Sequence, residues 1–130
     1  MGIMPVSDGS IHLDGMDLVK VAGYHRAKLG IGYMPEVAEM AKRRASTLSG
    51  GQQKMVALAR AIMSGRKLLL LDEPFEGLSP AMGDKFANAI LDIQTGDLAI
   101  LVAESDVKRL NFVKKVYTIE RGEIVPDTAN

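Results

Sequence analysis

The sequence predicts an α/β domain built around a mainly parallel sheet. Strand-length apolar runs alternate with helix-length amphipathic segments from residue 30 to residue 103, a pattern typical of parallel α/β folds. Two of these runs, residues 67–71 and 98–103, are almost wholly aliphatic, as expected of strands buried on both faces. With 130 residues the chain is expected to form one domain with its own core.

The N-terminal third is predicted to contain short elements, each ended by glycine or proline. In chain order they are a strand at 10–14 ending in a turn at Gly15, a helix at 18–29 interrupted at Gly23, a strand at 30–34 stopped by Pro35, and a charged helix at 38–45.

The clearest predicted helix covers residues 52–63. Four apolar residues recur at the helical spacing i, i+3, i+4 and i+7, and they are Met55, Leu58, Ala59 and Ile62. Ser49 is a natural N-cap for this helix, and Gly65 is a natural stop.

The C-terminal half continues the alternation of strands and helices. Its predicted elements are a strand at 67–71, a helix from Pro80 to Gly96, a strand at 98–103, a short helix at 106–112, and a hairpin formed by 115–120 and 123–125.

Composition excludes several classes of function. The chain has no cysteine, so it has no disulfides and no thiolate metal sites. Its 16 basic and 16 acidic residues cancel, so charge does not indicate nucleic acid as a partner. No apolar run approaches the roughly 20 residues of a spanning helix, and the N-terminus lacks the pattern of a signal peptide. We therefore expect a cytoplasmic protein.

Asp72 and Glu73 are candidate functional residues because they directly follow four leucines. Open α/β sheets bind ligands at the carboxyl ends of their strands. Asp72 is suited to hold a hydrated Mg²⁺, which prefers one or two carboxylates together with phosphate oxygens. Glu73 is suited to orient and deprotonate an attacking water. An isolated Asp-Glu-Pro would more simply be a solvated strand end, but its position after the helix at 52–63 favours function.

The segment Ser49-Gly50-Gly51-Gln52 precedes that helix and is a candidate phosphate site. Unpaired backbone N–H groups and the helix dipole favour an anion at a helix N-terminus. Glycines allow a phosphate to approach the backbone closely, and Gln52 adds an amide donor. For Ser-Gly-Gly alone, an ordinary N-cap would be the simpler interpretation.

Taken together, residues 47–53 and 68–74 resemble the signature motif and the Walker B motif of ATP-binding-cassette (ABC) ATPases, the motor domains of ABC transporters. The resemblance implies a P-loop-NTPase-like three-layer domain with ATP and Mg²⁺ as ligands. In this family the signature loop contacts the γ-phosphate of ATP held by a partner subunit.

The resemblance also implies a role for each matching position. The implied roles are nucleotide contact in trans for Ser49, Gly50, Gly51 and Gln52, Mg²⁺ binding through water for Asp72, catalysis for Glu73, the Q-loop position for Glu36, the D-loop for Ser79 and the switch position for Ser105. Glu in the Q-loop position is familiar in the branch that serves branched-chain amino acid uptake. Residues 116–125 resemble the closing hairpin of the family.

The chain departs from the family pattern in three respects. No Gly-x-x-x-x-Gly-Lys-Ser/Thr phosphate loop (Walker A) occurs in it. The helical subdomain that family members carry before the signature loop is reduced to residues 37–46. Ser105 stands where a histidine usually senses the γ-phosphate. We therefore interpret the chain as one truncated domain, with 1–36 running to the Q-loop, 37–64 holding the signature segment and 65–130 the remainder.

Three functions follow as alternatives. The first is the ATPase subunit of an importer, with branched-chain amino acids as candidate cargo, permease subunits and a second ATPase subunit as partners, and a place at the inner side of the membrane. The isolated chain is then expected not to hydrolyse ATP. The second is a binding module that donates its signature half-site to an intact partner. The third is an eroded partial gene product, which the position of Met1 just after the expected phosphate loop favours.

The sheet is expected to show the consequence of the missing strand. In the family the phosphate-loop strand is internal to the sheet, so its loss predicts a gap or an unpaired edge. Chromosome-organising and repair ATPases are the runner-up family, but coiled-coil heptads flank their signature motif, and this chain has none.

Overall fold

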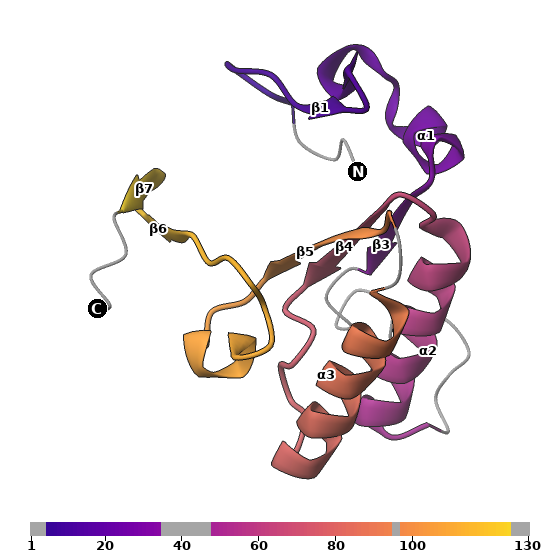
Figure 1. Cartoon of the computed structure of the whole chain (residues 1–130), viewed down its shortest axis with the longest axis vertical. Helices are drawn as coiled ribbons and strands as arrows, with labels where there is room; N and C mark the ends of the chain where they lie inside the picture. Colours follow the sequence, from indigo (N-terminus) through magenta and orange to yellow (C-terminus); the bar gives the residue numbers. More distant parts are fainter. Residues whose placement is uncertain (1–4, 35–47, 95–96, 126–130) are drawn as a thin grey trace.

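The computed structural model describes residues 5–34, 48–94 and 97–125, and its centre is a three-stranded parallel sheet (Figure 1). The strands stand in the order β3 (Ile31–Met34), β4 (Leu68–Asp72) and β5 (Ala99–Ala103). Met34 lies opposite Leu71, and Leu71 lies opposite Val102. The predicted α/β class, with its parallel sheet, is therefore confirmed.

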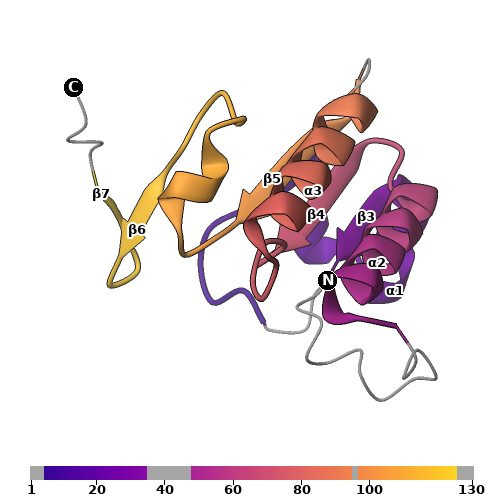
Figure 2. The ribbon, with the colours of Figure 1, turned by 90° about the horizontal axis from the view of Figure 1, so that it is seen from below.

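Two helices, α2 (Gly50–Ser64) and α3 (Pro80–Ile93), lie side by side on one face of this sheet (Figures 1 and 2). Between them and the sheet lies the core, whose buried members are Met34, Ala57, Leu58, Ala61, Leu69, Leu71, Phe75, Phe86 and Ile90. Phe75, just after β4, meets Phe86 of α3 edge to face with ring centroids 5.7 Å apart. Burial of these side chains fixes both helices relative to the carboxyl ends of the strands.

The opposite face of the sheet is much less covered, so the expectation of strands buried on both faces is wrong. Along β4 burial alternates, with Leu69 and Leu71 buried and their neighbours only partly buried. On β5 the side chain of Leu101 is 60% exposed. The aliphatic composition of these strands predicts burial on both faces, but within the described residues the helices cover one.

β4 and β5 pair directly with each other, so the expected gap in the sheet is absent. Their parallel register runs without interruption from Leu68 opposite Ala99 to Asp72 opposite Ala103. Among the residues that the structure describes, β5 is at the end of this sheet, which agrees with the alternative expectation of an unpaired edge.

The buried stripe of α2 differs from the predicted one. Ala59 is exposed, and the buried residues are Lys54, Ala57, Leu58 and Ala61. The small residues are buried because the end of α2 approaches β3 very closely. A Cβ placed on Gly32 would lie 2.1 Å from the Ala61 carbonyl oxygen and 2.9 Å from Gly65 Cα. Close backbone approach, rather than side-chain size, therefore sets which face of α2 is inside.

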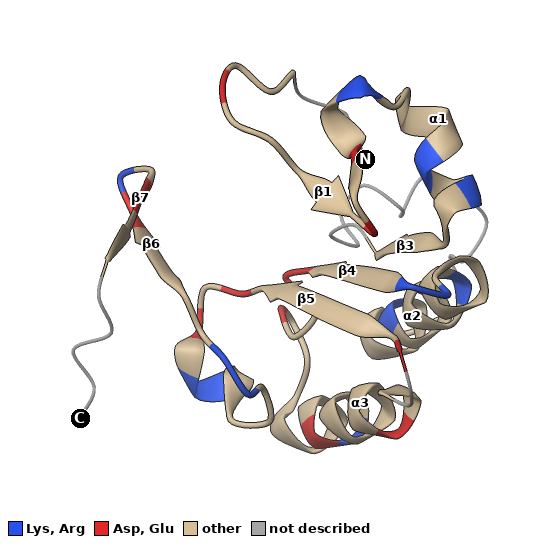
Figure 3. Ribbon diagram, turned by 45° about the horizontal axis from the view of Figure 1, so that its top comes forward, with Lys and Arg blue, Asp and Glu red and all other residues tan. Residues whose placement is uncertain are grey.

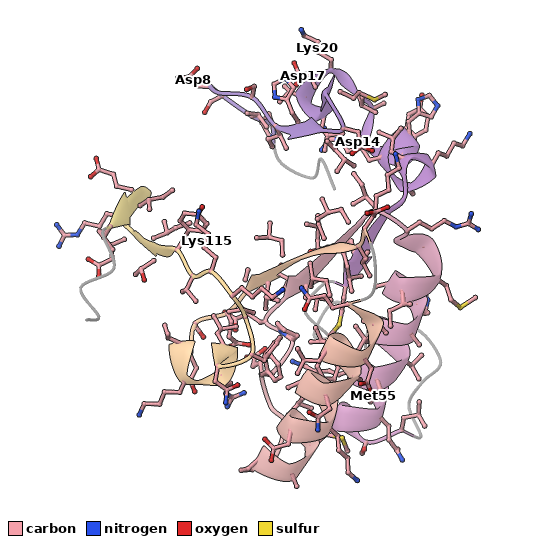
Figure 4. The ribbon with its side chains drawn as sticks, in the orientation of Figure 1. Asp8, Asp14, Asp17, Lys20, Met55 and Lys115 are labelled. Atoms are coloured by element: carbon pink, nitrogen blue, oxygen red, sulfur yellow. The ribbon has the colours of Figure 1, made fainter. Side chains whose placement is uncertain are left out.

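The N-terminal elements are shorter than expected. β1 (His12–Leu13) and β2 (Met16–Asp17) form a hairpin whose turn places Asp14 and Gly15 at positive φ. The predicted helix at 18–29 is instead three short pieces, Leu18–Lys20 (3₁₀), α1 (Gly23–Arg26) and Ala27–Leu29 (3₁₀). Figure 4 shows Asp17 beside Lys20, with which it forms an ion pair of 3.4 Å.

The C-terminal elements follow the prediction. A 3₁₀ helix (Val107–Leu110) is capped by Asp106, and the hairpin consists of β6 (Thr118–Glu120) and β7 (Glu123–Val125). In Figure 1 this hairpin lies beyond β5. The helix predicted at 38–45 and the Q-loop position Glu36 lie outside the described residues. Among the described helices, none has the length and apolar character needed to cross a membrane.

Candidate functional site

The carboxyl edge of the parallel sheet brings together most of the residues singled out in the sequence. Asp72 and Glu73 end β4, and Glu104 and Ser105 follow β5, so acidic residues gather at this edge (Figure 3). α2 runs back along the sheet, which places its N-terminal turn at the same edge, and Ser79 caps α3 nearby. This is the edge at which open α/β sheets bind ligands.

Glu73 has an unusual backbone conformation that its neighbours support. Its φ is 43°, in the left-handed region that non-glycine residues rarely adopt. Its N–H donates to the Ala103 carbonyl at 2.9 Å, and its carbonyl accepts from Lys54 Nζ at 2.7 Å and from the Glu76 N–H at 3.3 Å. Contacts from β5, α2 and the following turn therefore hold this residue at the end of β4.

The Glu73 side chain is turned toward Ser105. Its Oε2 accepts from the Ser105 hydroxyl at 3.3 Å and from the Ser105 N–H at 3.4 Å. The predicted catalytic position and the predicted switch position are thus in contact. A serine hydroxyl reaches Glu73 here by hydrogen bonding but has no imidazole ring to extend further toward a phosphate.

Glu104 is a site residue that the sequence did not single out. Its Oε2 accepts from the Phe75 N–H at 3.2 Å, which anchors the turn that follows β4. Partial burial, and then the hydrogen-bonded carboxylate of Glu73, raise the pKa of Glu104 above its ordinary value. Its position directly after a strand parallel to β4 is the signal that could have identified it.

Asp72 is half-buried and accepts a hydrogen bond at 3.3 Å from the Tyr33 hydroxyl, donated to its Oδ2. Across the described ranges, no group of three or more His, Cys, Asp or Glu side chains could by itself enclose a metal ion. The donor set fits Mg²⁺ of the kind that is held by one carboxylate, waters and phosphate oxygens, and it does not fit an all-protein metal cage.

The N-terminus of α2 is closed by a capping box. The Ser49 hydroxyl accepts from the Gln52 N–H at 3.4 Å, and the Gln52 Oε1 accepts from the Ser49 N–H at 2.9 Å. The predicted N-cap is therefore confirmed. The two polar side chains of the loop bond to the helix end itself, so the backbone donors of Gly50 and Gly51 are the groups best placed for an anion.

The two glycines of this loop differ in their surroundings. A Cβ on Gly50 would meet no atom within 4 Å, so the space beside it is open. A Cβ on Gly51 would lie 3.1 Å from Met82 Cγ and 3.5 Å from Leu78 Cδ2, so this glycine allows α2 to pack on the start of α3. Gly50 faces the space that a ligand could enter, whereas Gly51 serves the packing.

Ser79 is the N-cap of α3, but its side chain makes no capping hydrogen bond. It lines a cavity of about 280 Å³ together with Phe75, Leu78, Pro80 and residues of the 3₁₀ helix, Lys108 and Arg109. The D-loop position thus lies beside the site rather than among its carboxylates.

Lys54 is the second site residue that sequence reasoning missed. Its side chain is only 5% exposed, and its ammonium reaches the Glu73 carbonyl. A lysine is usually assigned to the solvent side of a helix. The signal available in the sequence is that Lys54 lies three and seven residues before Ala57 and Ala61, on the side of α2 with the small residues.

Comparison with known proteins agrees with this arrangement. Residues 26–76 match the family described as "ABC transporter". A probable ABC transporter ATP-binding protein of Azorhizobium caulinodans is 30% identical over 95% of this chain and 59% of its own length. The branched-chain amino acid transport ATP-binding protein BraG of Pseudomonas aeruginosa is 37% identical over 70% of this chain and 40% of its own length. The chain is therefore related to the ATP-binding proteins of ABC transporters, as the sequence motifs indicated.

Solved structures show the same fold. A nucleotide-free ATP-binding cassette from an ABC transporter superposes with a TM-score of 0.83 at 17% identity, covering 96% of this chain and 71% of that one. The chain spans about three fifths of the length of an uncharacterized ABC transporter ATP-binding protein of Rhizobium meliloti, with 24% identity. That alignment extends over 165 positions, more than the 130 residues of this chain, so the relative contains internal residues that have no counterpart here.

Proposed function

We propose that this chain is an ATP-binding component of an ABC-type assembly and that the first turn of α2 contacts the terminal phosphate of the nucleotide. The carrying observation is the open space beside Gly50 at a capped helix N-terminus, on the same edge as Asp72 and Glu73. The backbone N–H groups of the first turn and the helix dipole favour an anion there.

The other residues of the edge have complementary roles in this proposal. Asp72, oriented by Tyr33, holds Mg²⁺ through water, and the ion supplies charge neutralisation to the phosphates when bound. Glu73, held by the Lys54, Ala103 and Ser105 contacts, orients the water that attacks the terminal phosphate of a nucleotide beside Asp72, whereas α2 contacts the nucleotide that the partner subunit holds.

A second ATP-binding subunit is part of the proposal. The 130 residues contain no Gly-x-x-x-x-Gly-Lys-Ser/Thr segment, and phosphoryl transfer depends mostly on the positioning and charge that such a loop provides. Because the signature loop of the family that the chain resembles contacts ATP held by a partner subunit, we propose that a partner's phosphate loop holds the phosphates and that α2 completes the site from the other side. The chain by itself is expected to bind Mg-ATP weakly and not to hydrolyse it.

A complementation assay tests this proposal. An ATP-binding protein of an ABC transporter is chosen whose sequence contains an intact Gly-x-x-x-x-Gly-Lys-Ser/Thr loop, and its own signature serine and glycines are replaced so that it loses ATP hydrolysis. Addition of the present chain should restore ATP hydrolysis. The chain carrying Gly50→Asp should not restore it, because the carboxylate repels phosphate, while Gly50→Asn is the neutral control of equal size. The helix dipole stabilises an aspartate at this position, so unfolding of the variant would not explain a loss of rescue. Equal rescue by all three chains would contradict the proposal.

We propose branched-chain amino acids as the cargo of the assembly to which this chain belongs. This proposal is supported by the relative BraG and by two further relatives whose names refer to the same transport, from Methanocaldococcus jannaschii and Archaeoglobus fulgidus. Co-purification of the chain with the permease subunits of such a transporter, under conditions in which permease subunits for other cargo do not co-purify, would support this assignment. Association with all permeases alike would contradict it.

A further inference from the structure

Lys54 is a charged residue on the buried face of α2. Among residues 5–34, 48–94 and 97–125, it is the only charged residue that is buried, with 5% of its surface exposed. Removing an ammonium group from water is costly unless hydrogen bonds replace the water. A methionine or leucine would fill the same part of the α2–sheet interface without this cost. The ammonium therefore requires an explanation beyond packing.

The ammonium of Lys54 connects two parts of the proposed site. Nζ donates to the Glu73 carbonyl at 2.7 Å, a short distance for a charged donor. Lys54 also lies three residues after Gly51, one turn into α2 from the loop at residues 48–52. One side chain therefore joins the helix that begins at the phosphate-binding loop to the backbone of the proposed catalytic glutamate.

The backbone of Glu73 is a position at which such a contact has consequences. With φ at 43° the residue lies outside its preferred conformations and depends on its neighbours. Among the described residues, the other donor to this carbonyl is the Glu76 N–H, at the longer distance of 3.3 Å, so loss of Lys54 would remove the closer of the two. Rotation of this peptide would turn the Glu73 carboxylate away from Ser105, which it contacts at 3.3 and 3.4 Å.

We propose that Lys54 is a positioning residue that couples residues 48–52, which lead into α2 and begin its first turn, to the orientation of Glu73, an inference that rests on the proposed function. A displacement of the first turn of α2 moves the ammonium, and the ammonium moves the Glu73 carbonyl. The carboxylate then changes its angle to the site. Contact of a phosphate with the first turn of α2 would in this way align the Glu73 carboxylate that orients the water.

The first test uses the full chain without ligand. In a spectrum selective for lysine ammonium groups, Lys54 should exchange its protons more slowly than the exposed Lys85 and should show a scalar coupling from Nζ to the Glu73 carbonyl carbon. Equal exchange at the two lysines, with no coupling, would overturn the proposal.

The second test uses variants and the Ser105 amide as the reporter of Glu73. Lys54→Met removes the donor and keeps the length of the side chain, and Lys54→Arg keeps a donor. We expect the Ser105 resonance to move in the methionine variant and to remain near its wild-type position in the arginine variant, with Ile100 of β5 unmoved in both. An unmoved Ser105 in Lys54→Met would overturn the proposal. If that variant does not fold, Lys54→Gln takes its place.

The coupling itself is measured in two ways that separate this proposal from the proposed function. Ser49→Ala loosens the N-terminus of α2 in the absence of ligand, and it should shift the Ser105 amide resonance only when Lys54 is present. An equal shift in the Lys54→Met background would overturn the proposed coupling. Titration with Mg-ATP should then shift the amide resonances of Gly50 and Ser105 with one midpoint in the wild type. In Lys54→Met it should shift the Gly50 resonance alone. No movement of Gly50 in the wild type would contradict the proposed function, while the ligand-free result still decides the role of Lys54.

Discussion

Replacing Gly32 with alanine should strongly destabilise the fold, because β3 and the end of α2 touch at this residue. The added Cβ would lie 2.1 Å from the Ala61 carbonyl oxygen and 2.9 Å from the N and Cα atoms of Gly65. All three are backbone atoms, so no flexible side chain can move aside. Non-bonded heavy atoms pack best at about 3.5 Å or more, so α2 would have to move away from β3 by roughly 1.4 Å.

The magnitude follows from the cost of overpacking a core. Insertion of a single methyl group typically costs about 1–3 kcal/mol, and a contact with rigid backbone belongs at the upper end. We therefore expect Gly32→Ala to lower the free energy of unfolding by about 3 kcal/mol, which for a domain of this size lowers Tm by about 10 °C.

Urea denaturation followed by circular dichroism measures the effect, with Gly83→Ala as a matched control. Gly83 is inside α3, and a Cβ there would make only an ordinary contact with Phe75 at 3.9 Å. Alanine is a better helix former, so this variant should be more stable by about 0.5–1 kcal/mol. A Gly32→Ala chain as stable as the wild type would refute the close approach of α2 to β3.

Three further predictions concern the cap, the sheet and one carboxyl group. Ser49→Ala should destabilise the chain by about 0.5–1 kcal/mol through loss of the cap, while Ser79→Ala, which loses no capping bond, should change stability by less than about 0.5 kcal/mol. Equal losses of unfolding free energy in the two variants, measured by chemical denaturation, would contradict this. Leu69→Ala should cost about 2–5 kcal/mol and Leu101→Ala less than about 1 kcal/mol, because the first is buried and the second exposed; equal losses would mean that both sheet faces are covered. The pKa of Glu104 is raised in the folded state, so the folded chain binds more protons than the unfolded chain above pH 4.5, and stability should fall as pH rises through that raised pKa. Glu104→Gln should reduce this loss of stability with rising pH, measured by denaturation curves from pH 4.5 upward. An unchanged dependence of stability on pH would contradict the assignment of the raised pKa to Glu104.

The sequence predicts the ends of elements better than their buried faces. Ser49 and Gly65 mark the ends of α2 correctly, because capping depends on local backbone groups. The buried face of the same helix could not be read from hydrophobicity, since Gly32 and Gly65 bring the backbones together and select Ala57 and Ala61 over larger neighbours. Such an approach depends on two segments about 30 residues apart in the chain, and a local pattern does not contain it.

The candidate site was predicted in part for a similar reason. Asp72 and Glu73 follow from their position at the end of an aliphatic strand, a feature that the sequence displays directly. The sequence holds a signal for the positions of Lys54 and Glu104 but not for the atoms that they contact, because each contact depends on the unusual turn that begins at Glu73. The sequence left open whether the sheet would have a gap or an unpaired edge, since this expectation came from the family arrangement and not from these strands, and the direct pairing of β4 with β5 excludes a gap between them.

Titration calorimetry of the full chain with Mg-ATP is the decisive measurement for a phosphate site at the N-terminus of α2. We expect weak binding, with a Kd of about 1 mM (about −4 kcal/mol), for the wild type and for Gly50→Asn. We expect that Gly50→Asp, whose added carboxylate occupies the open space at the N-terminus of α2, binds at least tenfold more weakly. Equal affinity in all three chains, or no binding by the folded wild type at 10 Kd (about 10 mM), would contradict a phosphate site at this helix.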